Sequence, residues 1–264
     1  SVAGYRVATT GDSVLLYITN ANGQVDQYWD GAASNTGSLE GGTGTWNSSN
    51  ANWATLAGGS DTVWGGSVGR FQGATGGTVT VEGAQSFDML VFSATDDSST
   101  YTLSTGTGGK LLLSPYSLTT GTIQVDAATA TVDVEITDGV RGDDGVTAVN
   151  TLTKTGSGIL VLSHANTLTG GITVSAGTLQ VADDSALGAT SATLTLDGGT
   201  FSADGSFATD AARGFAYISA SSPNDCDSPS WTTLFPKISF HRSRMSRSSS
   251  AETSGARDDG AEGV

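Results

Sequence analysis

Residues 156–188 read GSGILVLSHANTLTGGITVSAGTLQVADDSALG. Apolar residues in this stretch fall two apart, as in Leu160/Leu162, Ile172/Val174 and Leu179/Val181. A period of two places alternate side chains on opposite faces of an extended chain, so each run predicts a short strand with one face inward. Glycine and Asn or Asp turns separate the runs, which predicts sharp corners between strands and no helix.

The same pattern recurs earlier in the chain. Residues 158–181 laid on residues 109–132, a shift of 49, give 11 identities in 24 gap-free positions, and the apolar positions agree in phase. A shorter echo follows at residues 192–201. A unit of this size cannot bury its own apolar face, so we expect neighbouring units to stack and share a core. The side chains predicted to form the core of the repeats are Leu111, Leu113, Ile123, Val125, Leu160, Leu162, Ile172, Val174, Leu179 and Val181.

The composition also favours an all-β protein. Glycine accounts for 37 of the 264 residues, and charged residues make up only 14%. Thr and Val are common, whereas helix formers such as Lys, Glu, Gln and Met are scarce. Short strands separated by glycines therefore predict a β-solenoid. A β-sandwich would show a similar alternation, but with longer strands and fewer glycines.

Charge and cysteine content narrow the range of functions. A net charge of −15 disfavours nucleic acid as a partner, because neutralising phosphate needs Lys and Arg. The single cysteine, Cys226, excludes a disulfide framework or a cysteine metal site within residues 1–225. No apolar run approaches the ~18 residues of a membrane helix. No signal peptide is visible, and the chain opens on Ser1, which indicates processing or a fragment.

The stretch from Gly158 to Val181 resembles the passenger-associated strand repeat of bacterial autotransporters. It reads GILVLS, NTLTGG, ITVSAG and TLQV, in the order of the family pattern G-x-L-x-L-x-x-x-N-x-[YT]-x-G-G-T-x-V-x-x-G-x-L-x-V. Leu168 and Ile172 depart from it, where the family often has an aromatic residue and usually a threonine. The resemblance covers roughly residues 25–207. It implies a right-handed parallel β-helix, exported to the cell surface by type V secretion through a C-terminal β-barrel that we expect to be missing from this chain.

A tryptophan-containing segment upstream also looks like passengers of this kind. It contains YWDG (28–31), GGTGTWN (41–47), NW (52–53) and VW (63–64). In the family such a segment commonly precedes the strand repeats. We therefore divide the chain into the end of a preceding β segment (1–24), an irregular Trp-containing passenger segment (25–107), the β-helical strand repeats (108–210), and a disordered or out-of-frame tail (211–264).

The residue usage changes abruptly beyond about Arg213. Residues 214–264 contain three of the four prolines, the only cysteine and five of the 11 basic residues. The stretch HRSRMSRSSS (241–250) has no strand pattern and predicts disorder. A basic interaction tail is one interpretation. Translation out of frame is the other, and it explains why the change falls where the next repeat should run.

Few residues are candidates for catalysis, metal binding or ligand binding. His164 follows Ser163, but the repeat alignment places it in a turn, which indicates a surface position. Clustered carboxylates serve as acid and base or as Ca²⁺ ligands in polysaccharide-cleaving β-helices. Adjacent Asp residues in a strand point to opposite faces, however, and those in turns are usually solvated caps. The pairs here are Asp96-Asp97, Asp143-Asp144 and Asp183-Asp184, and the tripeptide Arg141-Gly142-Asp143 is a weak integrin-ligand signal.

The tryptophans allow two interpretations. Their rings could stack on sugar rings while the indole N–H groups remain free to bond. They could instead fill the core of an irregular segment or cover the open edge of the first solenoid rung. The residues concerned are Trp29, Trp46, Trp53 and Trp64.

These observations predict a non-catalytic passenger, a stiff stalk that presents adhesive surfaces outside a Gram-negative cell. We expect no catalytic residue, no metal and no cofactor. The expected partners are a host or neighbouring-cell surface or a glycan, together with the chain's own C-terminal barrel, and not nucleic acid. Two alternatives remain: a β-helical polysaccharide lyase or hydrolase, and a secreted carbohydrate-binding module.

Overall fold

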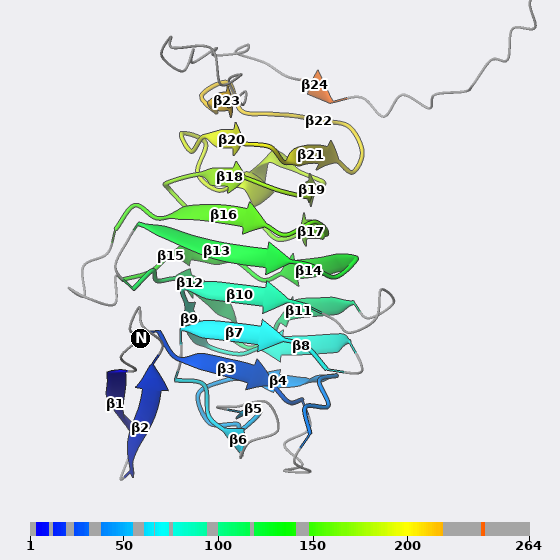
Figure 1. The fold of residues 1–264 in the computed structure, drawn as a ribbon. Coiled ribbons are helices and arrows are strands. Elements are labelled where there is room, and N and C mark those ends of the chain that lie inside the picture. Colours follow the sequence, from blue (N-terminus) through cyan, green and yellow to red (C-terminus); the bar gives the residue numbers. More distant parts are fainter. Residues whose placement is uncertain are drawn as a thin grey trace, which may run out of the picture.

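The computed structural model describes residues 4–10, 13–19, 24–31, 38–54, 61–65, 67–73, 76–93, 100–116, 119–140, 148–218 and 239–240. These residues form β-strands and one short 3-10 helix, η1 (Asp184–Leu187), with no α-helix among them. Most strands belong to parallel sheets that run along the molecule, as Figure 1 shows. The prediction of an all-β chain is confirmed for the described residues.

Two long sheets form the body of the molecule. The ten-stranded sheet contains, in spatial order, β23 (Phe215–Tyr217), β20 (Leu194–Leu196), β18 (Ile172–Val174), β16 (Thr151–Thr155), β13 (Thr120–Val125), β10 (Met89–Phe92), β7 (Val68–Phe71), β3 (Asp26–Trp29), β5 (Trp53–Ala54) and β6 (Asp61–Thr62). The seven-stranded sheet contains β21 (Thr200–Ala203), β19 (Thr178–Val181), β17 (Ile159–Leu162), β14 (Thr129–Asp133), β11 (Tyr101–Thr105), β8 (Gly77–Val81) and β4 (Gly44–Trp46).

Smaller sheets complete the architecture. A three-stranded parallel sheet is formed by β15 (Ile136–Asp138), β12 (Lys110–Leu113) and β9 (Ala84–Phe87). The N-terminal β1 (Gly4–Thr10) and β2 (Ser13–Thr19) form an antiparallel hairpin. At the other end, β22 (Phe207–Ala208) pairs antiparallel with β24 (Ser239–Phe240).

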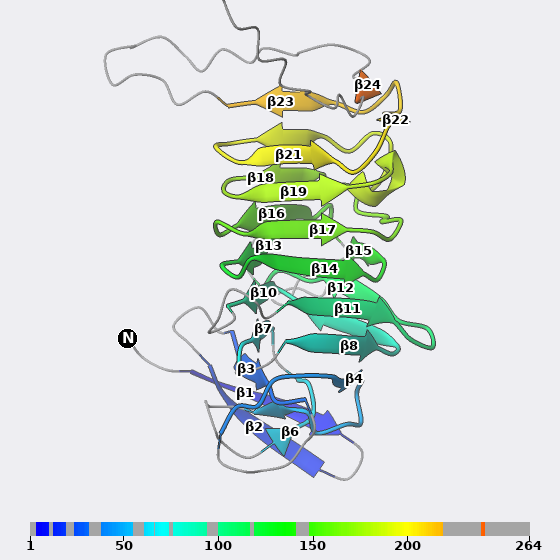
Figure 2. The same ribbon diagram turned by 90° about the vertical axis from the view of Figure 1, so that its right-hand side faces the viewer.

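The chain alternates between the two long sheets. We call a strand of the ten-stranded sheet, together with the seven-stranded-sheet strand that follows it, a circuit. From β7 to β19, every strand of the ten-stranded sheet is followed along the chain by a strand of the seven-stranded sheet, and both pair in parallel with the corresponding strands of the next circuit. Figure 2 shows the circuits as successive layers. Each circuit therefore covers the open edge of the one before it.

Glycines at the corners allow this close layering. A Cβ atom added at Gly158 would lie 1.9 Å from the carbonyl oxygen of Ala127 in the preceding circuit. Gly177, with φ +63°, adopts a left-handed conformation that side chains disfavour. The abundance of glycine in the sequence thus reflects the tight approach of one corner to the next.

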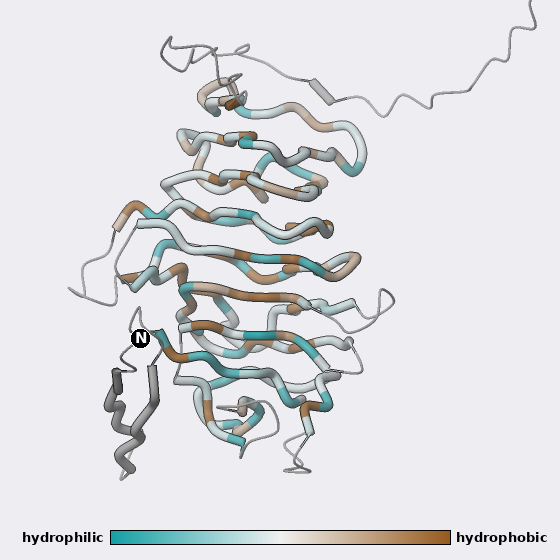
Figure 3. The backbone as a smooth tube through the Cα atoms, viewed as in Figure 1, coloured by the Kyte–Doolittle hydropathy of each residue, from teal (hydrophilic) through white to brown (hydrophobic). Residues whose placement is uncertain are grey.

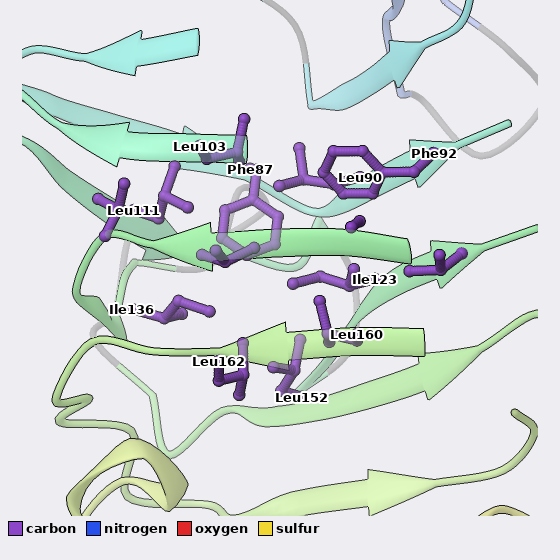
Figure 4. Close-up of a cluster of buried hydrophobic side chains, with 14 of the residues drawn as sticks. Phe87, Leu90, Phe92, Leu103, Leu111, Ile123, Ile136, Leu152, Leu160 and Leu162 are labelled. Carbon is purple, nitrogen blue, oxygen red and sulfur yellow. The ribbon is translucent and has the colours of Figure 1, made fainter. Parts of the chain in front are cut away.

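The core lies between the sheets and is apolar. All ten side chains predicted to line the core of the repeats are at most 1% exposed. Figure 3 shows hydrophobic and hydrophilic residues alternating along many strands, and Figure 4 shows Leu160, Leu162, Ile123 and Leu111 among the buried side chains. The period of two in the sequence therefore identified the inward positions.

The 49-residue shift does not describe one structural unit. Strand β17 lies on β14, with Leu160 opposite Ala130, whereas the sequence alignment had laid it on β12, a strand of the three-stranded sheet. The layers are closer in sequence: Leu194 pairs with Ile172, 22 residues apart. Short period-two runs separated by glycine corners resemble one another whichever layer they come from, so sequence similarity could not distinguish one layer from two.

The predicted domain boundaries differ from the structure at two places. The Trp-containing segment was expected to be irregular, yet its strands β3 to β11 belong to the same sheets as the later strands. Its layers escape detection because aromatic residues replace Leu and Val, and the loops between strands vary in length. The repeats were expected to end at residue 210, but β23 (Phe215–Tyr217) pairs in parallel with β20. The residues of the predicted tail beyond 218 lie outside the described part, except 239–240.

Candidate functional site

An aromatic cluster fills the end of the stack nearest β3. The side chains of Trp29, Trp46 and Trp53 are 0% exposed, and Trp64 is partly buried against them. Ring centroids lie 5.3 Å apart for Trp29–Trp53 and 4.4 Å apart for Trp53–Trp64. Phe71 packs on the inner side of this cluster, 5.4 Å from Trp53. The fully buried rings leave no face for a sugar, which corrects the glycan-stacking interpretation for these three tryptophans.

A short antiparallel hairpin closes this end. Strands β5 and β6 continue the ten-stranded sheet beyond β3, but in antiparallel orientation. The buried Gln27 side chain donates to Thr62 Oγ1 at 2.9 Å and to the Val63 carbonyl at 3.0 Å, which holds the hairpin in place. The Trp64 indole donates to the Ser86 carbonyl at 2.9 Å. These contacts support the second interpretation of the tryptophans, a cover over the edge of the first circuit.

Tryptophan fluorescence tests this assignment. We expect an emission spectrum of buried indoles that does not change when soluble glycans are added, because the rings are enclosed. Trp231 lies outside the described residues, so the measurement should use a Trp231→Phe chain. Glycan-dependent quenching of this chain would contradict the assignment, and would restore the sugar-binding role of the cluster.

Ser163 and His164 lie close to one carboxylate. Ser163 Oγ donates to Asp133 Oδ1 at 3.2 Å, and His164 Nδ1 lies 3.7 Å from the same oxygen. The histidine and aspartate side chains are 40% and 53% exposed. In a nucleophilic triad the histidine stands between the serine and the acid, whereas here the acid stands between the other two. The arrangement provides no base for Ser163 and is consistent with a solvated surface cluster.

The neighbouring acid is held in an ion pair. Lys110 Nζ lies 2.8 Å from Glu135 Oε2, and Thr167 Oγ1 donates to Glu135 Oε1 at 2.8 Å. The hydrogen bond from Lys110 is the main cause that holds the pKa of Glu135 below its ordinary value. Glu135 is therefore an ionised surface group and not a proton donor near neutral pH.

The pair Asp183-Asp184 has structural roles. Asp183 Oδ1 accepts a hydrogen bond from the Ser185 amide at 2.8 Å, which caps η1. Hydrogen bonding to the Ser185 side chain, and then to its amide, holds the pKa of the Asp183 carboxyl group below its ordinary value. Asp184 pairs with Arg213 at 2.7 Å. The other two Asp pairs and the Arg141-Gly142-Asp143 tripeptide lie outside the described residues. Among the described residues, no group of three or more His, Cys, Asp or Glu side chains is placed to hold a metal ion.

Arg213 is a buried residue that sequence analysis missed. Its side chain is 1% exposed, and its guanidinium also donates to main-chain carbonyls of η1 and of the loop after it. These are the carbonyls of Asp184, Leu187, Gly188, Ala189 and Ala192, at 3.0–3.2 Å. No sequence signal marked it, because it lies where the repeat pattern had already faded.

Lys154 is the second residue that sequence analysis missed. It lies at an inward position of β16 and is 0% exposed. Its amine donates to the carbonyls of Thr155 at 2.6 Å, Gly156 at 2.8 Å and Ala176 at 3.1 Å. Desolvation lowers the pKa of Lys154 from 10.5 to about 8, while Asp126 partly opposes the shift. The signal was present in the stretch TLTKT (151–155), where Lys154 shares the phase of Leu152.

This burial predicts a pH dependence of stability. Between pH 8 and 10.5 the unfolded chain keeps the Lys154 proton while the folded chain has released it. The free energy of unfolding should therefore rise with pH across this window, by about 3 kcal/mol at most from this group. Urea unfolding at pH 7, 9 and 10.5 measures it as the difference between the native chain and Lys154→Met. Identical pH profiles for the two chains would contradict the prediction.

The outer faces of the sheets carry hydroxyl groups. Thr122, Thr153, Thr173 and Thr195 are register partners in four successive strands of the ten-stranded sheet, and all are half-buried. On the seven-stranded sheet, Thr78, Thr102 and Thr131 form a similar column. These columns present regularly spaced hydroxyl groups on the outer faces of the two sheets.

Comparison with known proteins relates this architecture to a family. Residues 152–181, which run from the second residue of β16 to the end of β19, match the passenger-associated-transport-repeat model. The chain is also 33% identical over 191 residues, 70% of its length, to the adhesin BmaC autotransporter of Brucella suis biovar 1 (strain 1330). Both matches support its similarity to autotransporter passengers. The chain covers only 5% of the Brucella protein. No solved structure shows a significant match to the chain, and no helix within its described residues is long and apolar enough to cross a membrane.

Proposed function

We propose that this chain is a right-handed parallel β-helix that serves as a non-catalytic stalk outside a Gram-negative cell and presents adhesive surfaces there. The observation that carries the proposal is the unbroken series of parallel pairings from β3 to β23. A rod of layers that share one core is stiff, because each layer is held by main-chain bonds on both sides. The hand is inferred from the rule that crossovers between parallel strands of one sheet are right-handed.

The relative's name supports the adhesive part of the proposal. The Brucella protein is named an adhesin, and the chain aligns with a small part of it. The outer threonine columns offer hydroxyl groups to a host-cell surface, a neighbouring cell or a glycan. The acids that could have supported a lyase either serve structural roles, as Asp183 and Asp184 do, or lie outside the described residues. These points support a binding role over catalysis.

Adhesion of coated beads tests the proposal. Beads that carry the folded chain should adhere to cultured host cells or to bacteria of the same strain. Beads that carry Leu160→Asp, which we expect to be unfolded, have nearly the same composition and charge and should not adhere. Equal adhesion by both preparations, or by neither, would contradict a function that depends on the folded stack.

A further inference from the structure

The apolar pattern of the ten-stranded sheet does not by itself define its register. The inward positions are Leu152 and Lys154 on β16, and Ile172 and Val174 on β18. Sliding β18 by two residues would return apolar side chains to the inward face. The sequence even favours such a slip. In the sheet, Val174 is in line with Ile123, with Lys154 on the strand between them. The repeat alignment instead places Ile172 on Ile123, two residues away from the observed register.

Lys154 is the inward residue that is not apolar in these strands. Its amine has three acceptors in the observed register: two at the corner that follows β16, and the carbonyl of Ala176 at the corner that follows β18. The same corner is joined by a hydrogen bond from the Ser175 amide to the Lys154 carbonyl, at 2.9 Å. Lys154 therefore bonds to the next circuit through both its side chain and its main chain.

We propose that Lys154 is a positioning residue that fixes the register of β18 on β16. A slip of two residues would move the Ala176 carbonyl by about 6.6 Å, which is beyond hydrogen-bonding distance of the amine. The buried amine would lose a partner with no water to replace it, and such a loss is costly. Neither Leu152 nor Val174 could distinguish the native register from the slipped one in this way, because the apolar contacts are nearly as favourable after the slip. The lysine thus selects one register at some cost in stability.

The charged surroundings agree with this role. Among the charged groups of the described residues, Asp126, at the corner after β13, is the one whose field acts on the amine. The corner after β18 consists of Ser175, Ala176 and Gly177, which carry no charge. The ammonium is therefore held chiefly by carbonyl oxygens at fixed places in two circuits. Hydrogen bonds to carbonyl oxygens at fixed positions are lost when a strand slips, whereas attraction to a distant carboxylate would change little.

Cross-strand disulfide trapping tests the proposal on the full chain in a Cys226→Ser background. Thr153 and Thr173 are register partners on the outer face, so their double cysteine variant reports the native register. Thr155 and Thr173 would become partners only if β18 slipped by two residues, because the diagonal distance in the native register is too long for a disulfide. Each pair is made with Lys154, with Lys154→Met and with Lys154→Leu. Leu152→Met, at the other inward position of β16, is the matched control.

With Lys154 in place we expect the native disulfide to exceed the slipped one by roughly tenfold or more, as the loss of one buried hydrogen bond implies. In Lys154→Met and Lys154→Leu the two yields should come within about threefold, while Leu152→Met should keep the native preference. A native preference unchanged in both lysine variants would overturn the proposal. Failure of both variants to fold would also overturn it, since Lys154 would then be required for folding itself and not for the choice of register.

Discussion

Leu160→Asp is expected to abolish folding of the stacked region. Leu160 is 0% exposed and lies between Ala130 and Leu179, its partners in the circuits on either side. Burying a leucine contributes about 1.5–3 kcal/mol. An aspartate in its place would add the larger cost of a buried charge without a partner. Together these terms approach the whole stability of a typical domain, about 5–15 kcal/mol.

A thermal melt followed by circular dichroism measures this effect. The control is His164→Ala, because the His164 side chain is 40% exposed in the neighbouring turn and faces only a solvated carboxylate. We expect its stability to stay within about 0.5 kcal/mol of the native chain. A cooperative melt for Leu160→Asp at the native temperature would show that the inward register of β17 is wrong.

Arg213→Ala is expected to cost about 3–5 kcal/mol, the usual loss when one partner of a buried ion pair is removed. The guanidinium makes two hydrogen bonds to the Asp184 carboxylate, at 2.7 and 3.1 Å. It also satisfies the carbonyls of the loop that follows η1. Alanine would leave a poorly solvated carboxylate and several buried carbonyls without partners, and would leave a cavity beside them.

Urea unfolding gives the size of this loss, and hydrogen exchange gives its location. Protection should fall first at the amides of residues 184–192. Arg70→Ala is the matched control, because Arg70 pairs with Asp26 at 3.3 Å but the two side chains are 31% and 34% exposed. A surface pair of this kind contributes about 0–1 kcal/mol. Equal losses for the two arginine variants would contradict the burial of Arg213 in the stack.

The sequence defines the inward positions of this fold better than its layering. Leu160, Leu162 and Val174 could be assigned because the period of two depends only on each strand itself. The partner of each strand could not, since β17 matches β12 in sequence but lies on β14. Layer assignment depends on corner lengths and on contacts such as that of Lys154 with Ala176, which couple residues in different circuits.

The ends of the stack show a similar limit. The sequence singled out Trp29 and Trp53 as candidates. It could not show whether their rings bind a sugar or fill the core, because an aromatic ring suits both environments. Arg213 gave no signal, since its partners on η1 and the following loop lie 21–29 residues earlier in the chain. A buried charge outside a period-two strand, unlike Lys154, can be predicted only when the acceptors that surround it are known.

Distances between spin labels test the stacked architecture most directly. Thr78, Thr102, Thr131, Val161, Gln180 and Ser202 occupy successive layers of one column on the seven-stranded sheet. With one label at Ser202 and the second at Thr131, Thr102 or Thr78, in a Cys226→Ser chain, the Cα separations should be about 14, 19 and 24 Å, at about 4.8 Å for each layer. Equal steps of this size would confirm that the chain stacks layer upon layer. Distances that fail to grow in this order, as in a two-sheet sandwich, would contradict it.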